Sequence, residues 1–216
     1  EPLETAPEVH GETGLDGADL PDPDFKVQPI PAIELIAKTL RESDEKVTLV
    51  VTGPMTNAAL FLRVYPDLAK EKIDQIVFMG GAMGLGNWRP SVEFNIFVDP
   101  EAAKAQIMKD EIEQIGQINN PVAQAFHGLL NFFEQYHENP KWGFKGAPLH
   151  DPCTIAWLID PTMFGTDKMN VDVETQGDLT RGETVCDYYQ LTDKPQNTEV
   201  LLDIDREKFI QLIIDT

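Results

Sequence analysis

Short apolar runs and helical periodicities alternate along the chain, and their first clear succession is strand, helix, strand. Residues 47–51 (VTLVV) and 76–79 (IVFM) are continuous apolar runs, typical of strands buried on both faces of a parallel sheet. A turn and a helix capped by Thr56 are expected between them. This succession predicts a βαβ unit with a right-handed crossover. Thr52 and Met79, which follow the two strands, should therefore be neighbours at one sheet edge.

Apolar residues at helical spacing predict further helices. We expect them over Pro31 to about Ser43, from Asp99 through 108–115, over Pro121 to about His137, from Pro152 onward, and over Asp205–Asp215. In the second of these, one helical stretch follows another near Lys104 without a strand between them, although the alternation of strands and helices calls for a strand there.

The C-terminal part reads differently, because alternating or clustered apolar residues there indicate short strands separated by turns. The fold class predicted is α/β. It comprises an open, mostly parallel sheet with flanking helices and a small antiparallel β appendage near the C-terminus. We expect residues 1–216 to form a single domain.

Polar side chains collect after the strand that ends at Met79. Gly80 and Gly81 terminate this strand, and Asn87, Glu93 and Asn95 follow. In open α/β sheets, ligands bind beyond the carboxyl ends of strands, so these side chains could hydrogen-bond a hydroxylated ligand. The alternative stays open that Asn87 belongs to an ordinary turn and Glu93 to the surface.

Composition narrows the function classes. The chain is 42% hydrophobic and 25% charged, as in a globular protein, and its net charge of -20 repels nucleic acid polymers and anionic membranes. The carboxylates suit either a divalent cation or a solvated surface. Two cysteines, Cys153 and Cys186, indicate a reducing cytoplasm. No segment is apolar enough to span a membrane, and none reads as a signal peptide. The sequence begins with Glu1, so a preceding targeting signal would not be visible.

Two histidines stand in chemically suggestive surroundings. His10 opens the glycine-rich segment 10–17 (HGETGLDG), where backbone can approach a ligand closely. His150 adjoins Asp151 at a predicted helix start, so the pair could transfer a proton and bind a hard cation; alternatively, Asp151 only caps the helix. His127 and His137 are expected on the polar face or last turn of their helix. Walker, CxxC, GxGxxG and GxSxG motifs are absent from the sequence.

Three separated segments together resemble the nucleoside hydrolase family, especially its inosine-uridine and pyrimidine-preferring members. They are HGETGLDG, VVTGPMTN with FMGGAM and GNWRPSVEFNIFVDPEAA, and GAPLHDPCTIAWLI. The resemblance implies hydrolysis of the N-glycosidic bond of ribonucleosides to ribose and free base in nucleoside salvage. It also implies dependence on Ca²⁺ and a homodimer or homotetramer. The alternative is a catalytically inactive fragment or nucleoside-binding protein of the same family.

Residue by residue, the resemblance assigns roles to ten positions. It implies that the ribose-facing side chains are Asn87, Glu93, Asn95, Met79 and Phe94. It places Trp142 against the base, and His150 and His10 beside the leaving base as catalytic residues. It makes the Thr52 carbonyl and the Asp151 carboxylate calcium ligands.

The sequence departs from the family in one respect. The aspartate cluster DxDxxxDD, which supplies most calcium ligands and the catalytic base in the family, does not occur in it. A strand expected near 104–105 is also missing. We therefore expect the sequence to lack an N-terminal segment and an internal strand. A polypeptide truly without them should bind calcium weakly and hydrolyse nothing.

Overall fold

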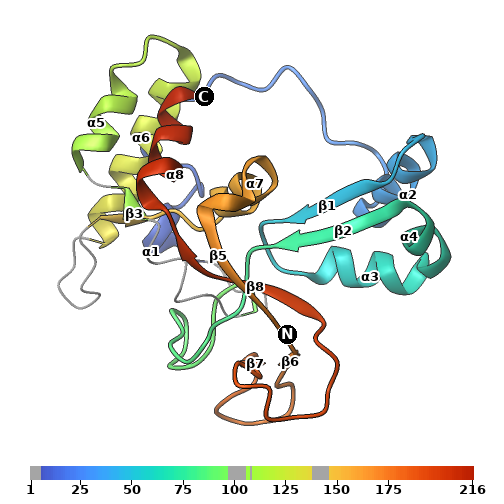
Figure 1. Cartoon of the computed structure of the whole chain (residues 1–216). Coiled ribbons are helices and arrows are strands. Elements are labelled where there is room, and N and C mark those ends of the chain that lie inside the picture. Colours follow the sequence, from blue (N-terminus) through green and yellow to red (C-terminus); the bar gives the residue numbers. More distant parts are fainter. Residues whose placement is uncertain (1–5, 97–105, 108, 138–145) are drawn as a thin grey trace. The chain divides into compact units, whose positions relative to one another are not determined.

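The computed structural model describes residues 6–96, 106–107, 109–137 and 146–216, and it groups them into two compact units. The grouping does not test the single-domain prediction, which stays a prediction. None of the helices in these ranges is long and apolar enough to cross a membrane. Figure 1 labels most of the elements of both units.

The first unit is mainly helical. It contains α1 (Pro7–His10), β3 (Gln106–Ile107), α5 (Lys109–Gly116), α6 (Pro121–His137), β4 (Ala147–Pro148) and α8 (Arg206–Asp215). Ion pairs tie its helices together, since Arg206 binds Glu111 across α8 and α5, and Lys109 lies 3.9 Å from the Glu134 carboxyl across α5 and α6. The bounds of α6 match the predicted helix.

His137 lies in the last turn of α6, one of the two places expected for it, and it is buried there rather than on a polar face. Its Nδ1 lies 2.9 Å from the Phe133 carbonyl, and its ring packs edge-on against Phe133 and Tyr136. Burial lowers the pKa of His137 below its ordinary value, because the charged form loses hydration. The neutral imidazole is therefore part of the core of this unit.

The second unit is built on a parallel pair of strands. Its elements are α2 (Ala32–Glu42), β1 (Val47–Val51), α3 (Thr56–Val64), α4 (Pro66–Lys72), β2 (Ile73–Phe78), α7 (Pro152–Ile159), the 3-10 turn η2 (Pro161–Met163), β5 (Phe164–Met169), β6 (Val171–Val173), β7 (Thr184–Cys186) and β8 (Thr198–Ile204). β1 and β2 lie parallel with Val51 opposite Phe78, and α3 and α4 connect them (Figure 1). Leu40 and Phe61 belong to the buried cluster shared by the three flanking helices. The predicted strand, helix, strand succession is confirmed.

Local details of this succession differ from the predictions. Thr56 is the first residue of α3 rather than its cap, because Met55 holds the N-cap position without a side-chain capping bond. Pro66 begins a second helix, α4, as its fixed φ favours the first turn. β1 and residues 76–78 of β2 are half-buried rather than buried on both faces.

The helix predicted from Asp99 through 108–115 is not continuous. Residues 97–105 lie outside the described ranges, but β3 pairs antiparallel with β4, and α5 begins only at Lys109. A short strand therefore stands just before α5, where the apolar periodicity had predicted helix. It also lies next to positions 104–105, where a strand had been expected to be missing.

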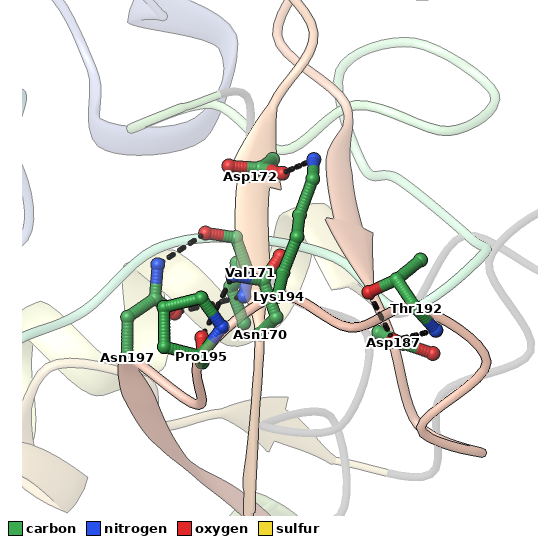
Figure 2. Close-up of polar contacts among 8 residues, drawn as sticks. All are labelled: Asn170, Val171, Asp172, Asp187, Thr192, Lys194, Pro195 and Asn197. Atoms are coloured by element: carbon green, nitrogen blue, oxygen red, sulfur yellow. Dashed lines mark hydrogen bonds and ion pairs between the residues drawn. The ribbon is translucent and has the colours of Figure 1, made fainter.

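The C-terminal appendage is antiparallel, as predicted, with β6 paired to β7; β8 lies beside β5. Side chains fix its long connection, as Figure 2 shows: Asn197 accepts from the Val171 amide at 2.9 Å and donates to the Val171 carbonyl at 3.0 Å. The Asp187 carboxyl accepts from the Thr192 hydroxyl and amide. These bonds, the hydroxyl first, lower the pKa of Asp187 below its ordinary value.

Thr184 connects this appendage to the segment beyond β2. Its buried hydroxyl donates to the Ala82 carbonyl at 2.7 Å and accepts from the Ala82 amide at 2.6 Å. A Cβ at Gly81, whose φ is +101°, would lie 3.1 Å from Thr184 Cγ2. Only glycine suits both this conformation and this approach. The appendage thus fixes the chain where it leaves the sheet.

Replacing Thr184 by valine should destabilise the protein by about 1–3 kcal/mol, because the buried Ala82 amide and carbonyl would lose their partner without a change of side-chain shape. Urea unfolding measures this loss. Thr184→Ser, which keeps the hydroxyl, should recover most of it, whereas equal losses for both variants would show that the methyl group matters instead.

Candidate functional site

The carboxyl ends of β1 and β2 meet beneath one amide side chain. The Met79 amide donates to the Val51 carbonyl at 2.9 Å, which confirms that Thr52 and Met79 leave the sheet side by side. Asn95 Nδ2 lies 3.5 Å from the Thr52 carbonyl, 3.4 Å from the Met79 carbonyl and 3.0 Å from Met79 Sδ. Asn95 therefore spans both strand ends.

Glu93 is completely buried, with 0% of its surface exposed. Its Oε2 accepts from the Gly81 amide at 3.1 Å and from the Ile96 amide at 3.2 Å. The alternative that Glu93 is an ordinary surface acid is therefore wrong. Its carboxyl joins the two ends of the segment 81–96, which starts just after β2 and carries the predicted ribose-facing residues.

The middle of this segment is a compact turn. Asn87 is exposed, and its Oδ1 accepts from the Phe94 amide at 3.2 Å. The Trp88 and Phe94 rings meet edge to face at 5.2 Å, and Ser91 reaches the Glu183 carboxyl at 3.3 Å. Asn87 and Phe94 thus belong to one folded turn that contacts the antiparallel appendage.

A cavity lies beside β2 and includes part of the predicted site. Its lining includes Met79, Gly80, His150, Cys153, Trp157 and Thr184. His150 is half-buried and stands just before α7. The structure thus brings the leaving-base histidine of the prediction and the sugar-pocket methionine to one cavity, walled largely by apolar side chains.

Asp151 occupies the N-cap position of α7 and is exposed. Its side chain makes no capping bond, so the alternative that it only caps the helix has no support; its carbonyl accepts from the Thr154 hydroxyl at 2.7 Å. No group of three or more His, Cys, Asp or Glu that could hold a metal occurs among the described residues. The Thr52 carbonyl and the Asp151 carboxylate fall short of the six to eight oxygens that Ca²⁺ takes.

The remaining two predicted residues are His10 and Trp142. His10 ends α1 in the first unit, is exposed, and stacks on Phe133 with 5.5 Å between ring centroids and 5° between ring planes. Trp142 lies outside the described ranges. His10 therefore has a defined position within its unit.

Sequence reasoning missed the contributions of Thr184 and of two cavity residues, Cys153 and Trp157. Thr184 acts on Ala82, 102 positions away, so no local spacing could reveal it. Cys153 and Trp157 lie one turn apart on α7. Their helical spacing was a usable signal that one face of this helix lines the site.

Comparison with known proteins places these features in a family. The model of the inosine-uridine preferring nucleoside hydrolases matches residues 1–211. A pyrimidine-specific ribonucleoside hydrolase of Enterobacter sp. (strain 638) is 54% identical over 229 residues, covering 97% of this chain and 73% of that protein. Its counterpart from Shewanella sp. (strain ANA-3) is 53% identical over 233 residues, covering 99% and 73%.

Both alignments are longer than the 216-residue chain, so both relatives carry positions inside the matched region that have no counterpart here. Among solved structures, a purine-preferring ribonucleoside hydrolase from Gardnerella vaginalis superposes with a TM-score of 0.84 at 27% identity, covering 99% of this chain and 74% of that one. A plant nucleoside hydrolase shares the fold, with a TM-score of 0.85 at 24% identity over 98% and 74%. The chain belongs to the inosine-uridine preferring nucleoside hydrolase family.

Proposed function

We propose that the protein hydrolyses the N-glycosidic bond of ribonucleosides, preferably pyrimidine nucleosides such as uridine and cytidine, to ribose and free base. The observation that carries the proposal is the sheet edge where Asn95 spans the ends of β1 and β2, next to the cavity that Met79 and His150 line. Relatives 53% and 54% identical, named pyrimidine-specific ribonucleoside hydrolases, support the substrate class. They favour an enzyme over an inactive nucleoside-binding protein.

Holding the ribose is the first contribution of the chain's own residues. Asn87 and Asn95 offer amides suited to sugar hydroxyls, and Phe94 and Met79 offer apolar surface for the sugar ring. The Glu93 carboxyl holds the segment that carries them, through Gly81 and Ile96. A ribose fixed in this way presents its anomeric carbon in one orientation, which removes much of the entropic cost of the reaction.

Assisting the departing base is the second contribution. Cleavage of a glycosidic bond passes through an oxocarbenium-like transition state, in which the leaving group gains negative charge. His150, at the cavity, is suited to donate a proton or a hydrogen bond to the base, and we assign His10 to the base side as well. Such assistance is worth about 10²–10⁴-fold in rate.

Calcium is the metal we propose, from the resemblance to the family and from the oxygen donors at the site. The Thr52 carbonyl and the Asp151 carboxylate are the two proposed ligands among the described residues, and they do not complete a calcium site by themselves. A bound calcium ion would orient sugar hydroxyls and acidify a water.

We further propose that the protein works in the cytoplasm as a homodimer or homotetramer. The two thiols, Cys153 and Cys186, are not joined in a disulfide, as suits a reducing compartment. The oligomer is implied by the family resemblance alone.

Incubation with uridine, cytidine and inosine tests the proposed activity. We expect ribose release to be faster from the two pyrimidine nucleosides than from inosine, and to stop when EDTA removes calcium and resume when calcium is restored. Ribose release that is unchanged by chelation would contradict the calcium dependence. Nucleoside binding without any release would instead favour the nucleoside-binding protein.

Replacing His150 by alanine tests its role in leaving-base departure. We expect the rate on uridine to fall about 10²–10⁴-fold, because the poor leaving base loses its hydrogen-bond donor. A riboside with a nitrophenolate leaving group needs no such help and should be cleaved at nearly the normal rate. Equal losses on both substrates would exclude this role for His150.

A further inference from the structure

The segment 10–17 (HGETGLDG) is a folded loop within the first unit. Gly11 closes α1 with a φ of +78°, and its amide donates to the Pro7 carbonyl at 2.8 Å. The Asp16 carboxyl accepts from the Glu12 amide at 3.2 Å and from the Thr13 amide and hydroxyl. The Thr13 hydroxyl is the main reason that the pKa of Asp16 lies below its ordinary value. The backbone around His10 is therefore fixed by the loop's own bonds.

Two glycines bring this loop against α6. A Cβ built on Gly17 would lie 2.5 Å from the Gly128 carbonyl oxygen, and one built on Gly128 would lie 2.2 Å from the Gly17 carbonyl oxygen. The two backbones thus approach more closely than any side chain would permit. Glycine inside a helix costs stability relative to alanine, so Gly128 is explained by this close approach.

The stacked partner of His10 comes from the same helix. His10 is exposed, whereas Phe133 is half-buried and also packs against His137, with 4.3 Å between ring centroids. One face of the His10 imidazole lies parallel to the Phe133 ring. Parallel, offset stacking restricts rotation about the side-chain bonds of an otherwise exposed ring.

We propose that Phe133 is a positioning residue for His10, with Gly128 setting the distance between the His10 loop and α6. This inference rests on the proposed function, in which His10 acts beside the leaving base. Phe133 holds the imidazole in one rotamer, and in that rotamer the ring nitrogen atoms are oriented toward the leaving base.

Replacing Phe133 by leucine tests the proposal, because leucine keeps the apolar contact and removes the flat face. We expect kcat on uridine to fall about 2- to 10-fold, the population change that loss of one stacked pair produces, with KM nearly unchanged. Phe133→Tyr, which restores the face, should recover the rate. Phe126→Leu, the same change at another half-buried position of α6, is the matched control and should leave kcat unaltered.

A double-mutant cycle separates positioning from general damage to the fold. In a His10→Ala background, Phe133→Leu should have no further effect on kcat, because no imidazole remains to be positioned. The same fractional loss in both backgrounds, or a Phe133→Tyr variant as slow as Phe133→Leu, would overturn the proposal.

A nuclear magnetic resonance measurement tests the proposal without activity. The His10 ring protons should be shifted upfield by the Phe133 ring, and this shift should disappear in Phe133→Leu. It should also disappear in Gly128→Ala, whose methyl group would displace the loop despite its better helix propensity. Unchanged His10 shifts in Phe133→Leu would refute the positioning role. If the shift disappears in Phe133→Leu but the natural protein hydrolyses no nucleoside, the proposed function is refuted and the positioning of His10 is not.

Discussion

The buried carboxyl of Glu93 is the constraint on which the rest of the candidate site depends. Its Oε2 receives the amides of Gly81 and Ile96, which stand at opposite ends of the segment that follows β2. Asn87, Phe94 and Asn95 all lie between or beside these anchor points. Burying a carboxyl costs free energy unless it is hydrogen-bonded. The buried Glu93 side chain therefore depends on the folded segment that supplies its two amide donors. The residues proposed to grip ribose are thus positioned by backbone bonds to one side chain.

The elements predicted best were those with a strong local pattern. β1 and α6 have the bounds that the apolar run VTLVV and the wide apolar stripe of 121–137 indicated. A prediction failed where a distant contact decides the outcome, because a short strand, β3, pairs with β4 just before α5. His137 lies in the last turn of α6 as expected, but its burial there was not predicted. Helical periodicity reports neither a pairing between distant segments nor the burial of a polar residue.

The candidate site, too, has features that local sequence patterns predicted and features that depend on distant contacts. The parallel pairing predicted that Thr52 and Met79 leave the sheet together, and the position of the polar residues beyond a strand end suggested a ligand site. The residue types could not show that Glu93 is buried. Nor could they show that Thr184 hydrogen-bonds the backbone of Ala82, which lies 102 positions away in the sequence. The roles of Asn87, Asn95 and His150 came from family resemblance and stay proposals. The position of the loop 10–17 also depends on a segment distant in the sequence, because Gly17 meets Gly128 of α6 only in the folded unit.

Amide hydrogen exchange of Gly81 and Ile96, compared between the natural protein and Glu93→Gln, tests the central role of Glu93 most directly. Glutamine keeps only one acceptor oxygen and carries an NH₂ group in place of the other, so exchange of both amides should accelerate by roughly tenfold or more in the variant. The Met79 amide, bonded to the Val51 carbonyl, is the internal reference and should keep its rate. Unchanged exchange at Gly81 and Ile96 would contradict the account, because the segment would then be held by something other than Glu93.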